Sequence, residues 1–393
     1  MEFGIFVQGH APGQAKAHSP VYEQDWVRRE LELIRVADKC NWKYVWVTEH
    51  HFLEEYSHLS DSATFIAYAL AQTEQIHIGS GIFNMNPIVN HPLRLAERVA
   101  MLDQLSEGRF EFGTGRGAGS HEIGGFSLQH SDTRANWEET LRQIPKMWRQ
   151  KGYSYPDGKA FSVPTFGTQM MPDREGAFNV VPKPYAHTHP ALWVAAGSPG
   201  TYERAAKRGL GLLGFNVGSV WDMSPLIKTY KEHIRNAEPI GEYVNDNVMV
   251  TVGMVCLEDR QKAREYACSP GGSYLASLVF RYHDSFPRPD GIPQWPKLIP
   301  DPSLEDLDAR IEHGYALCGN PEEVIKQIAP YQEIGCDQLV FGVPGNLPHD
   351  VVLESIRVFG EQVIPKFDTE PKHSTTRFRE AAGGPLVPRE STS

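Results

Sequence analysis

The strongest constraint on the fold is a repeated alternation between short apolar runs and segments with helical spacing of apolar residues. The runs are short and rich in β-branched and aromatic residues, as expected of buried strands. Eight of them occur, at residues 1–7, at the start of 44–52, and at 75–81, 109–113, 191–196, 211–215, 247–257 and 338–341. Strands that alternate with helices form parallel sheets, and eight such units favour a closed (β/α)₈ TIM barrel over an open sheet.

The expected helices between these strands have recognisable starts. Asp25 can cap a helix over 26–41, Asp61 or Ser62 can cap one that runs to residue 71, and Pro92 opens one that ends at 105. Further helices are expected at 133–151, from 201 to 207, and at 222–237, 320–334 and 350–363.

Two stretches interrupt the alternation. Residues 152–190 and 269–304 show no helical period, and we interpret them as insertions in a single domain that spans 1–365. The tail, 366–393, is polar and rich in Gly, Pro, Ser and Thr, so it is expected to be disordered.

Composition excludes several classes of protein. With 393 residues, 40% of them hydrophobic, the chain can bury a full core. The net charge of −11 argues against binding to nucleic acids or anionic membranes, which attract basic surfaces. No signal peptide and no membrane-spanning run of about 18 apolar residues is found. The five cysteines are scattered and odd in number, which favours a reducing compartment and predicts a cytoplasmic protein.

The second apolar run ends in a charged corner that contains Glu49, His50 and His51. Catalytic groups of a (β/α)₈ barrel lie where its strands end, so these side chains are candidates for catalysis. A structural loop and half of a metal site are the alternatives, and the metal site is the weaker one because no H-E-x-x-H or C-x-x-C motif lies nearby. Adjacent residues of an extended segment point to opposite sides, so at most one of the two histidines is expected to face a given ligand.

Two segments are candidates for binding a phosphate. Residues 113–118 match the G-x-G-x-x-G/A dinucleotide fingerprint, but no helix is expected before Thr133, which disfavours a Rossmann site. Residues 197–201 follow a strand and open a helix, whose free amides favour an anion. There Ser198 and Thr201 could donate hydrogen bonds, although a plain helix cap is an equal alternative. Arg116 could supply a second, fork-shaped donor.

Taken together, these segments resemble the bacterial luciferase family of flavin-dependent monooxygenases. The resemblance rests on Trp46-Val47-Thr48-Glu49-His50-His51-Phe52, on His91-Pro92-Leu93-Arg94 and on residues 102–117, and weaker similarity continues to about residue 366. It implies a (β/α)₈ barrel that binds reduced FMN (FMNH₂) from a separate flavin reductase. It also implies that the protein uses dioxygen to oxygenate a second substrate, a small and largely apolar organic molecule, by hydroxylation or Baeyer-Villiger insertion.

The resemblance also implies roles for particular residues. His50 matches the family's catalytic histidine, Glu122 an acidic residue of the active-site rim, and Arg116 a contact of the flavin phosphate. Gly81 and Ile82 fall where the family often has a cis peptide bond under the flavin ring. Gly115 replaces a reactive cysteine of luciferase, so aldehyde-dependent light emission is not implied. We include Gly115, together with Gly197, Ser198 and Thr201, among the cofactor-binding residues.

Three further expectations complete this interpretation. A homodimer is expected through the helices at 62–71 and 93–105, with Phe65, Tyr68, Leu95 and Leu102 in the interface. A deazaflavin (F420)-dependent oxidoreductase on the same barrel is one alternative to the monooxygenase. A flavin-binding protein without catalytic activity is the other.

Overall fold

The computed structural model describes residues 1–11, 20–117, 119–163, 177–215, 218–284, 288–342 and 344–386. Its strands form one parallel sheet whose main members follow one another around a ring. The strands are β1 (Glu2–Val7), β2 (Tyr44–Val47), β3 (His77–Ser80), β4 (Phe83–Asn84), β5 (Phe110–Gly115), β6 (Leu192–Ala196), β7 (Gly211–Gly214), β8 (Val248–Cys256), β9 (Ala316–Gly319) and β10 (Gln338–Gly342).

The ring closes because β10 pairs with both β1 and β8. The predicted eight-stranded barrel is thereby confirmed, with the two short strands β4 and β9 outside the closed ring. β4 pairs with the end of β5, and β9 pairs with the end of β8.

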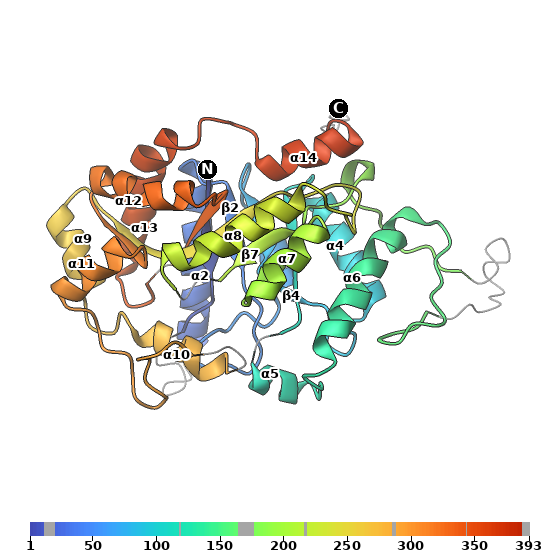
Figure 1. The fold of residues 1–393 in the computed structure, drawn as a ribbon, viewed down its shortest axis with the longest axis horizontal. Coiled ribbons are helices and arrows are strands. Elements are labelled where there is room, and N and C mark those ends of the chain that lie inside the picture. Colours follow the sequence, from blue (N-terminus) through green and yellow to red (C-terminus); the bar gives the residue numbers. More distant parts are fainter. Residues whose placement is uncertain are drawn as a thin grey trace.

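Helices surround the ring, as Figure 1 shows. They are α2 (Pro20–Lys39), α3 (Ser62–Leu70), α4 (Pro92–Leu105), α5 (Ser120–Gly125), α6 (Thr133–Arg149), α7 (Pro199–Lys207), α8 (Val220–Ile234), α9 (Arg260–Ala267), α10 (Tyr274–Tyr282), α11 (Leu304–Glu312), α12 (Pro321–Glu333), α13 (His349–Val358) and α14 (Ser374–Gly383). Asp61 caps α3 through a hydrogen bond from Thr64, and Asn320 caps α12.

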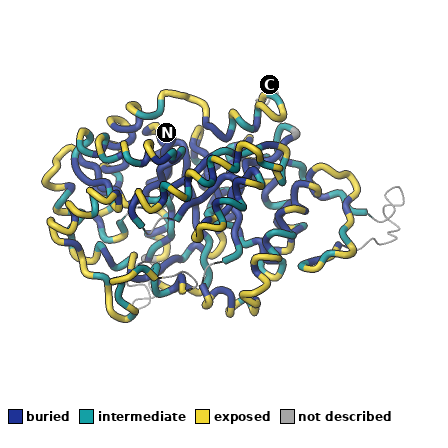
Figure 2. The backbone as a smooth tube through the Cα atoms, viewed as in Figure 1, coloured by how far each residue is buried: buried dark blue, intermediate teal, exposed yellow. Residues whose placement is uncertain are grey.

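Alternate residues of each strand face two different cores. One set packs outward against the helices, and the other fills the barrel with large rings such as Tyr44, Trp46 and Trp193. The rings of Trp46 and Trp193 meet edge to face, with centroids 5.0 Å apart. Gly79 makes room for them, because a Cβ atom there would overlap the indole of Trp46. The dark central strands of Figure 2 show how completely this region is buried.

Several expectations about irregular regions are wrong. The stretch 269–304 contains α10, and α9, β9 and α11 were not foreseen at all. A helix does begin shortly after the glycine-rich segment, at Ser120, although it is only 6 residues long. In these regions the sequence lacks the clear helical period that marked the barrel helices.

The tail is also not disordered where the structure describes it. Residues 366–386 cross the end of the barrel at which the strands begin, and α14 lies there beside the N-terminus (Figure 1). Its polar residues find buried partners: Arg379 is 2% exposed and Ser374 donates a hydrogen bond to the carboxylate of Glu2. Residues 387–393 lie outside the described residues. We call this covered end of the barrel the floor, and the opposite end, where the strands finish, the mouth.

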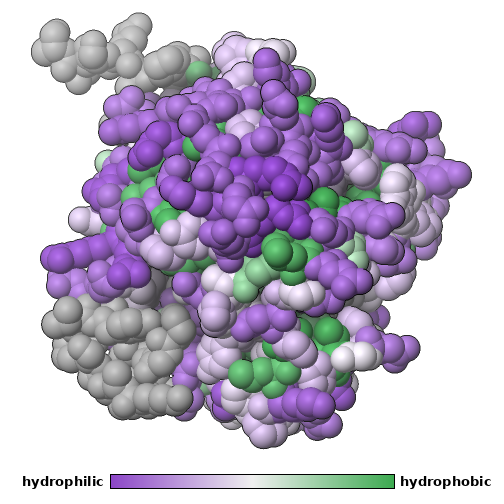
Figure 3. All heavy atoms as spheres, turned by 90° about the vertical axis from the view of Figure 1, so that its left-hand side faces the viewer, coloured by the Kyte–Doolittle hydropathy of each residue, from purple (hydrophilic) through white to green (hydrophobic). Residues whose placement is uncertain are grey.

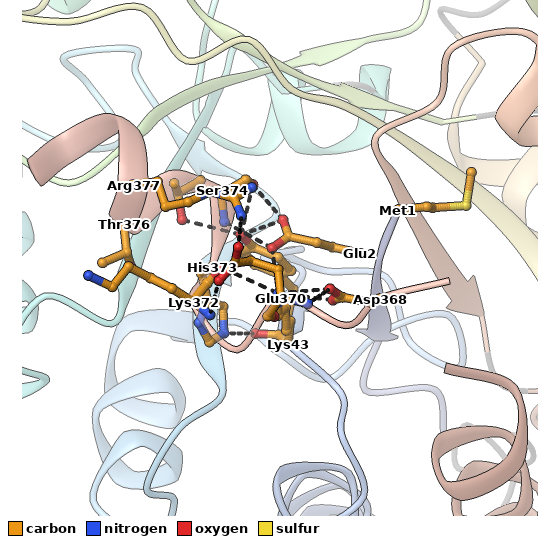
Figure 4. A network of polar contacts seen from close by, with 12 residues as sticks. Met1, Glu2, Lys43, Asp368, Glu370, Lys372, His373, Ser374, Thr376 and Arg377 are labelled. Carbon is orange, nitrogen blue, oxygen red and sulfur yellow. Dashed lines mark hydrogen bonds and ion pairs between the residues drawn. The ribbon is translucent and has the colours of Figure 1, made fainter. Parts of the chain in front are cut away.

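The floor holds a dense network of hydrogen bonds and ion pairs, drawn in Figure 4. The ammonium group of Lys43 lies 2.9 Å from carboxylate oxygens of both Glu2 and Asp368. It also donates to the carbonyl oxygen of Glu370, while the ring of His373 bonds to the carbonyl of Lys43. The tail is therefore tied to the first two strands by buried charges.

Candidate active site

One cavity at the mouth is lined by every residue that the sequence singled out. His50 follows β2, Gly81 and Ile82 follow β3, Gly115 and Arg116 end β5, and Gly197 and Ser198 follow β6. Glu122 comes from α5 and Thr201 from α7, and all of these residues face the same space. The parallel barrel brings them together because all of its strands finish at this end.

The Gly81–Ile82 peptide bond is cis, as the resemblance implied. Ile82 also accounts for the glycine at position 115. A Cβ atom on Gly115 would lie 2.6 Å from Cγ1 of Ile82, so a cysteine could not be placed there unless Ile82 moved. The isoleucine occupies the space that a larger residue at position 115 would need.

His50 and Glu122 form the polar centre of the cavity. Nδ1 of His50 lies 3.3 Å from Oε1 of Glu122, and the backbone N–H of His51 donates to the same oxygen at 2.7 Å. Burial alone would raise the pKa of Glu122, but the hydrogen bonds from His50 and from the His51 amide bring it below its usual value. Glu122 is therefore a carboxylate, so Nδ1 of His50 carries the proton and Nε2 is left as the basic atom.

His51 lines the same cavity as His50, so the expectation that only one of them faces a ligand is wrong. The chain leaves extended geometry after β2 and bends at His51 and Phe52, the latter with a φ of 65°. The ring of His51 packs edge-on against Phe126, and its Nε2 lies 3.7 Å from a carboxylate oxygen of Glu49. The carboxylate of Glu49 accepts a hydrogen bond from the hydroxyl of Ser62 at the start of α3, which holds the loop in place.

His283 and Tyr56 lie near His50, and neither was recognised from the sequence. His283, directly after α10, has its ring 5.3 Å from the ring of His50, and its Nε2 lies 2.9 Å from the hydroxyl of Tyr56. Burial lowers the pKa of His283 to about 3, and the neighbouring His50 acts in the same direction. His283 is thus neutral at physiological pH. It is distant in sequence from the other site residues and carries no motif.

The opposite side of the cavity is strongly basic. Arg116, Arg134 and Arg204 all line it, and no carboxylate of the described residues lies within 4.0 Å of their nitrogens. Burial, followed by repulsion from Arg134 and Arg204, lowers the pKa of Arg116. Arg204 could have been found in the sequence, since it lies three residues after Thr201 on one helical face. Arg134 stands on α6, where no motif marks it.

These arginines surround the start of α7. Ser198 is the N-cap residue, but its side chain makes no capping hydrogen bond; its hydroxyl lies 3.0 Å from that of Thr201. Ser198 thus occupies the N-cap position, as the plain-cap alternative expected, while its hydroxyl is not used for capping. Arg204 donates to the hydroxyl of Thr201, and Arg116 donates to Thr133. Two hydroxyls and three guanidinium groups form a cradle suited to a phosphate group. The helix start adds little, because Pro199 has no N–H and the N–H of Thr201 donates to the carbonyl oxygen of Ser198.

Part of the cavity lining is apolar. It comprises Gly81, Ile82, Val194, Ala195 and Phe215. Such a lining beside the cradle fits a planar ring system attached to a phosphate, which is the shape of FMN. Within the described part of the chain no cluster of metal-ligating side chains occurs, and no helix is long and apolar enough to cross a membrane.

Comparisons with known proteins agree with this geometry. The sequence profile of the luciferase-like monooxygenases matches residues 1–338. The alkanal monooxygenase alpha chain of Photorhabdus luminescens is 25% identical over 377 residues, which cover 93% of this chain and 96% of that protein.

Solved structures show the same fold. The oxygenating constituent of 3,6-diketocamphane monooxygenase from Pseudomonas putida, a type II Baeyer-Villiger monooxygenase in complex with FMN, has a TM-score of 0.72 at 20% identity. It covers 94% of this chain and 99% of its own. An F420-dependent secondary alcohol dehydrogenase in complex with an F420-acetone adduct has a TM-score of 0.63 at 18% identity, covering 93% and 99%.

Proposed function

Because this chain belongs to the luciferase-like monooxygenase family, we propose that it uses reduced FMN and dioxygen to oxygenate a small, largely apolar organic molecule. A separate reductase would deliver the reduced FMN. The observation that carries the proposal is the cavity that is lined together by a phosphate cradle, a His–carboxylate pair and apolar residues. Hydroxylation and Baeyer-Villiger insertion are both open to such a site.

The residues of the cradle would hold the FMN phosphate. A phosphate carries up to two negative charges, and it would relieve the repulsion among Arg116, Arg134 and Arg204. The hydroxyls of Ser198 and Thr201 would bind its remaining oxygens. The isoalloxazine ring would lie against Gly81, Ile82 and Gly115. Reduced FMN, when bound, would supply the electrons that activate dioxygen.

His50 would manage the proton that this chemistry requires. Its Nδ1 is held by Glu122, so Nε2 can accept or return a proton at the reacting group. Glu122 also fixes the backbone amide of His51, and it therefore positions the loop as well as the ring. The apolar lining limits the access of water, which would otherwise divert reduced flavin and oxygen to hydrogen peroxide.

The F420 alternative is tested by binding. We expect FMN to bind more tightly than riboflavin, and FMN to bind more tightly than F420. Titration of the protein with each ligand, followed by the change in ligand absorbance or fluorescence, measures this order. Tighter binding of F420 would favour a deazaflavin-dependent oxidoreductase. Consumption of reduced FMN and oxygen without any oxygenated product, over a panel of ketones, aldehydes and terpenes, would favour the non-catalytic alternative.

We also propose a cytoplasmic homodimer. Leu95 and Leu102 are buried in the core, so they cannot contribute to an interface, but Tyr68 on α3 and Leu105 on α4 are 61% and 65% exposed. By contrast, the face that carries α9 and α11 shows only separate hydrophobic patches on a hydrophilic surface (Figure 3). Light scattering is expected to give twice the chain mass of 44.1 kDa. The cysteines of the described residues are free thiols, which suits a reducing compartment.

A further inference from the structure

The mouth of the barrel contains a second cavity beside the first. It lies over the ends of β1, β8 and β10, and α10 covers it from the side. Its volume is about 290 Å³, which suits a small molecule and not a polymer. The first cavity lies over the ends of β2, β3, β5 and β6, on the other side of the mouth.

The second cavity differs from the first in charge. None of the described residues that line it is charged. Phe6, Phe215, Leu275 and Val279 make most of the wall. Gln8 contributes an amide and Thr251 a hydroxyl that donates to the carbonyl oxygen of Gly214. An ionised ligand would lose its hydration here without gaining a partner of opposite charge.

Two glycines line this second cavity, and neither glycine is explained by backbone geometry or by packing. Gly253 of β8 and Gly342 of β10 are directly paired across the two strands. Neither has the positive φ that favours glycine, and a Cβ atom on either would meet no atom of the described residues within 4 Å. Gly113 of β5 is the contrast, because a Cβ atom there would overlap the carbonyl oxygen of Ser80. Side chains are missing at 253 and 342 although the protein itself has room for them.

The missing side chains leave a strip of bare backbone that is two strands wide. Neighbouring strands lie about 4.8 Å apart, so the strip is wide enough to support a ring system. It also lies near the catalytic histidine. Phe215 borders both cavities. The ring of Phe215 lies 6.4 Å from the ring of His283, and the ring of His283 lies 5.3 Å from the ring of His50.

We propose that the second cavity binds the molecule to be oxygenated, and that this substrate is neutral, apolar and compact, such as a cyclic ketone resting on Gly253 and Gly342. The assignment of this ligand as the oxygenated substrate rests on the proposed function. The binding site itself can be tested without turnover.

The test uses two probes that share one cage-shaped skeleton and differ in charge, 2-adamantanone and adamantane-1-carboxylate. Binding of each to the full-length protein, in the presence of FMN, is measured by isothermal titration calorimetry and by ligand-observed saturation-transfer NMR. We expect saturable binding of the ketone and binding of the carboxylate that is weaker by about tenfold or more. No saturable binding of the ketone, or equal binding of both probes, overturns the proposal.

The variant Gly253→Ala/Gly342→Ala locates the site. Both methyl groups enter open space, so the variant should fold at least as stably as the wild type. We expect its affinity for 2-adamantanone to fall by about tenfold or more while its affinity for FMN stays unchanged. Gly124→Ala is the matched control, since Gly124 is exposed and a Cβ atom there also meets nothing within 4 Å. Unchanged ketone binding in the double variant would place the ketone elsewhere and overturn the proposal.

These results also separate the site from the reaction. If the ketone binds as expected but no ketone, aldehyde or terpene of the panel is oxygenated, the proposed function is wrong and the binding site stands. If ketones are oxygenated equally well by the wild type and by the double variant, the function stands and the second cavity is not the substrate site.

Discussion

At the floor of the barrel Arg379 makes two parallel hydrogen bonds to Asp103, at 2.8 and 2.7 Å, with both side chains buried. At the mouth Arg116 shares a cavity with Arg134 and Arg204, and no described carboxylate lies within ion-pair distance of them. The floor therefore holds charges that are already neutralised by the protein. The mouth holds guanidinium groups that no described carboxylate pairs with directly, which is expected of an anion-binding site.

The two His–Glu pairs differ in the same way. At the floor Nδ1 of His77 lies 2.7 Å from Oε1 of Glu111, and burial raises the pKa of Glu111 to about 8 and lowers that of His77 to about 3. At the mouth the pKa of Glu122 is lowered by its hydrogen bonds from His50 and the His51 amide, against the effect of burial. The same two residue types therefore form an uncharged pair at one end and a charged acceptor with a proton-carrying ring at the other.

The largest expected effect comes from replacing His50, which tests the role assigned to the His–Glu pair at the mouth. His50→Ala should lower the yield of oxygenated product in a single turnover by about 10² to 10⁴-fold, because a general acid or base is lost, and leave FMN binding and stability nearly unchanged. Hydrogen peroxide should replace the product. His51→Ala should be the milder variant. If His50→Ala keeps full coupling and His51→Ala loses it, the roles of the two residues are reversed.

The next effect concerns the floor. Arg379→Ala leaves the buried carboxylate of Asp103 without its cationic partner, with a hydrogen bond from the Tyr185 amide remaining, and should lower the free energy of unfolding by about 3 to 5 kcal/mol. Urea unfolding measures it. The double variant Arg379→Leu/Asp103→Leu removes both charges and should recover part of the loss. A loss below about 1 kcal/mol in Arg379→Ala would show that the tail contributes little to holding the barrel closed.

At the mouth the removal of an arginine should act in the opposite direction. Arg116→Ala should weaken FMN binding by about 1.5 to 3 kcal/mol and leave riboflavin, which lacks the phosphate, unaffected. Its stability without ligand should stay equal or rise, because repulsion from Arg134 and Arg204 is relieved. Fluorescence titration with both flavins, beside urea unfolding of the ligand-free protein, measures the two quantities. Equal losses for FMN and riboflavin would show that Arg116 contacts another part of the ligand.

The mouth of the barrel could be predicted from the sequence better than the floor, for a physical reason. The mouth was predictable because parallel strands finish together, so that local signals after separate strands, such as His50 and Arg116, converge in space. Arg134 and His283 were missed because Arg134 belongs to a helix and His283 to an insertion, and no strand end fixes the position of either residue.

The floor was not predictable, and the tail was wrongly expected to be disordered. Polar residues such as Ser374, Thr375 and Arg379 look solvated when read one by one. They are ordered because Glu2, Glu111 and Asp103, far away in sequence, accept hydrogen bonds from them. Composition reports the average polarity of a segment, and it carries no information about distant partners of this kind.

The last expected effect is the smallest per step of the measurement, at most about 1.4 kcal/mol per pH unit, and it sharpens the comparison through pH. Because the pKa of Glu111 is raised in the folded protein to about 8 from an unfolded value of 4.5, the folded state holds a proton that the unfolded state releases in that range. Glu111 should therefore lower the free energy of unfolding as pH rises from 4.5 to about 8, by at most about 1.4 kcal/mol per pH unit. Glu111→Gln keeps a neutral side chain of the same shape, so its unfolding free energy should lack this decline. Urea unfolding of both proteins at several pH values between 5.5 and 8.5 gives the difference between the two curves, which cancels the contributions of all other groups. If that difference is constant across the range, Glu111 is charged in the folded protein, and the floor then holds an ion pair with His77 instead of an uncharged pair.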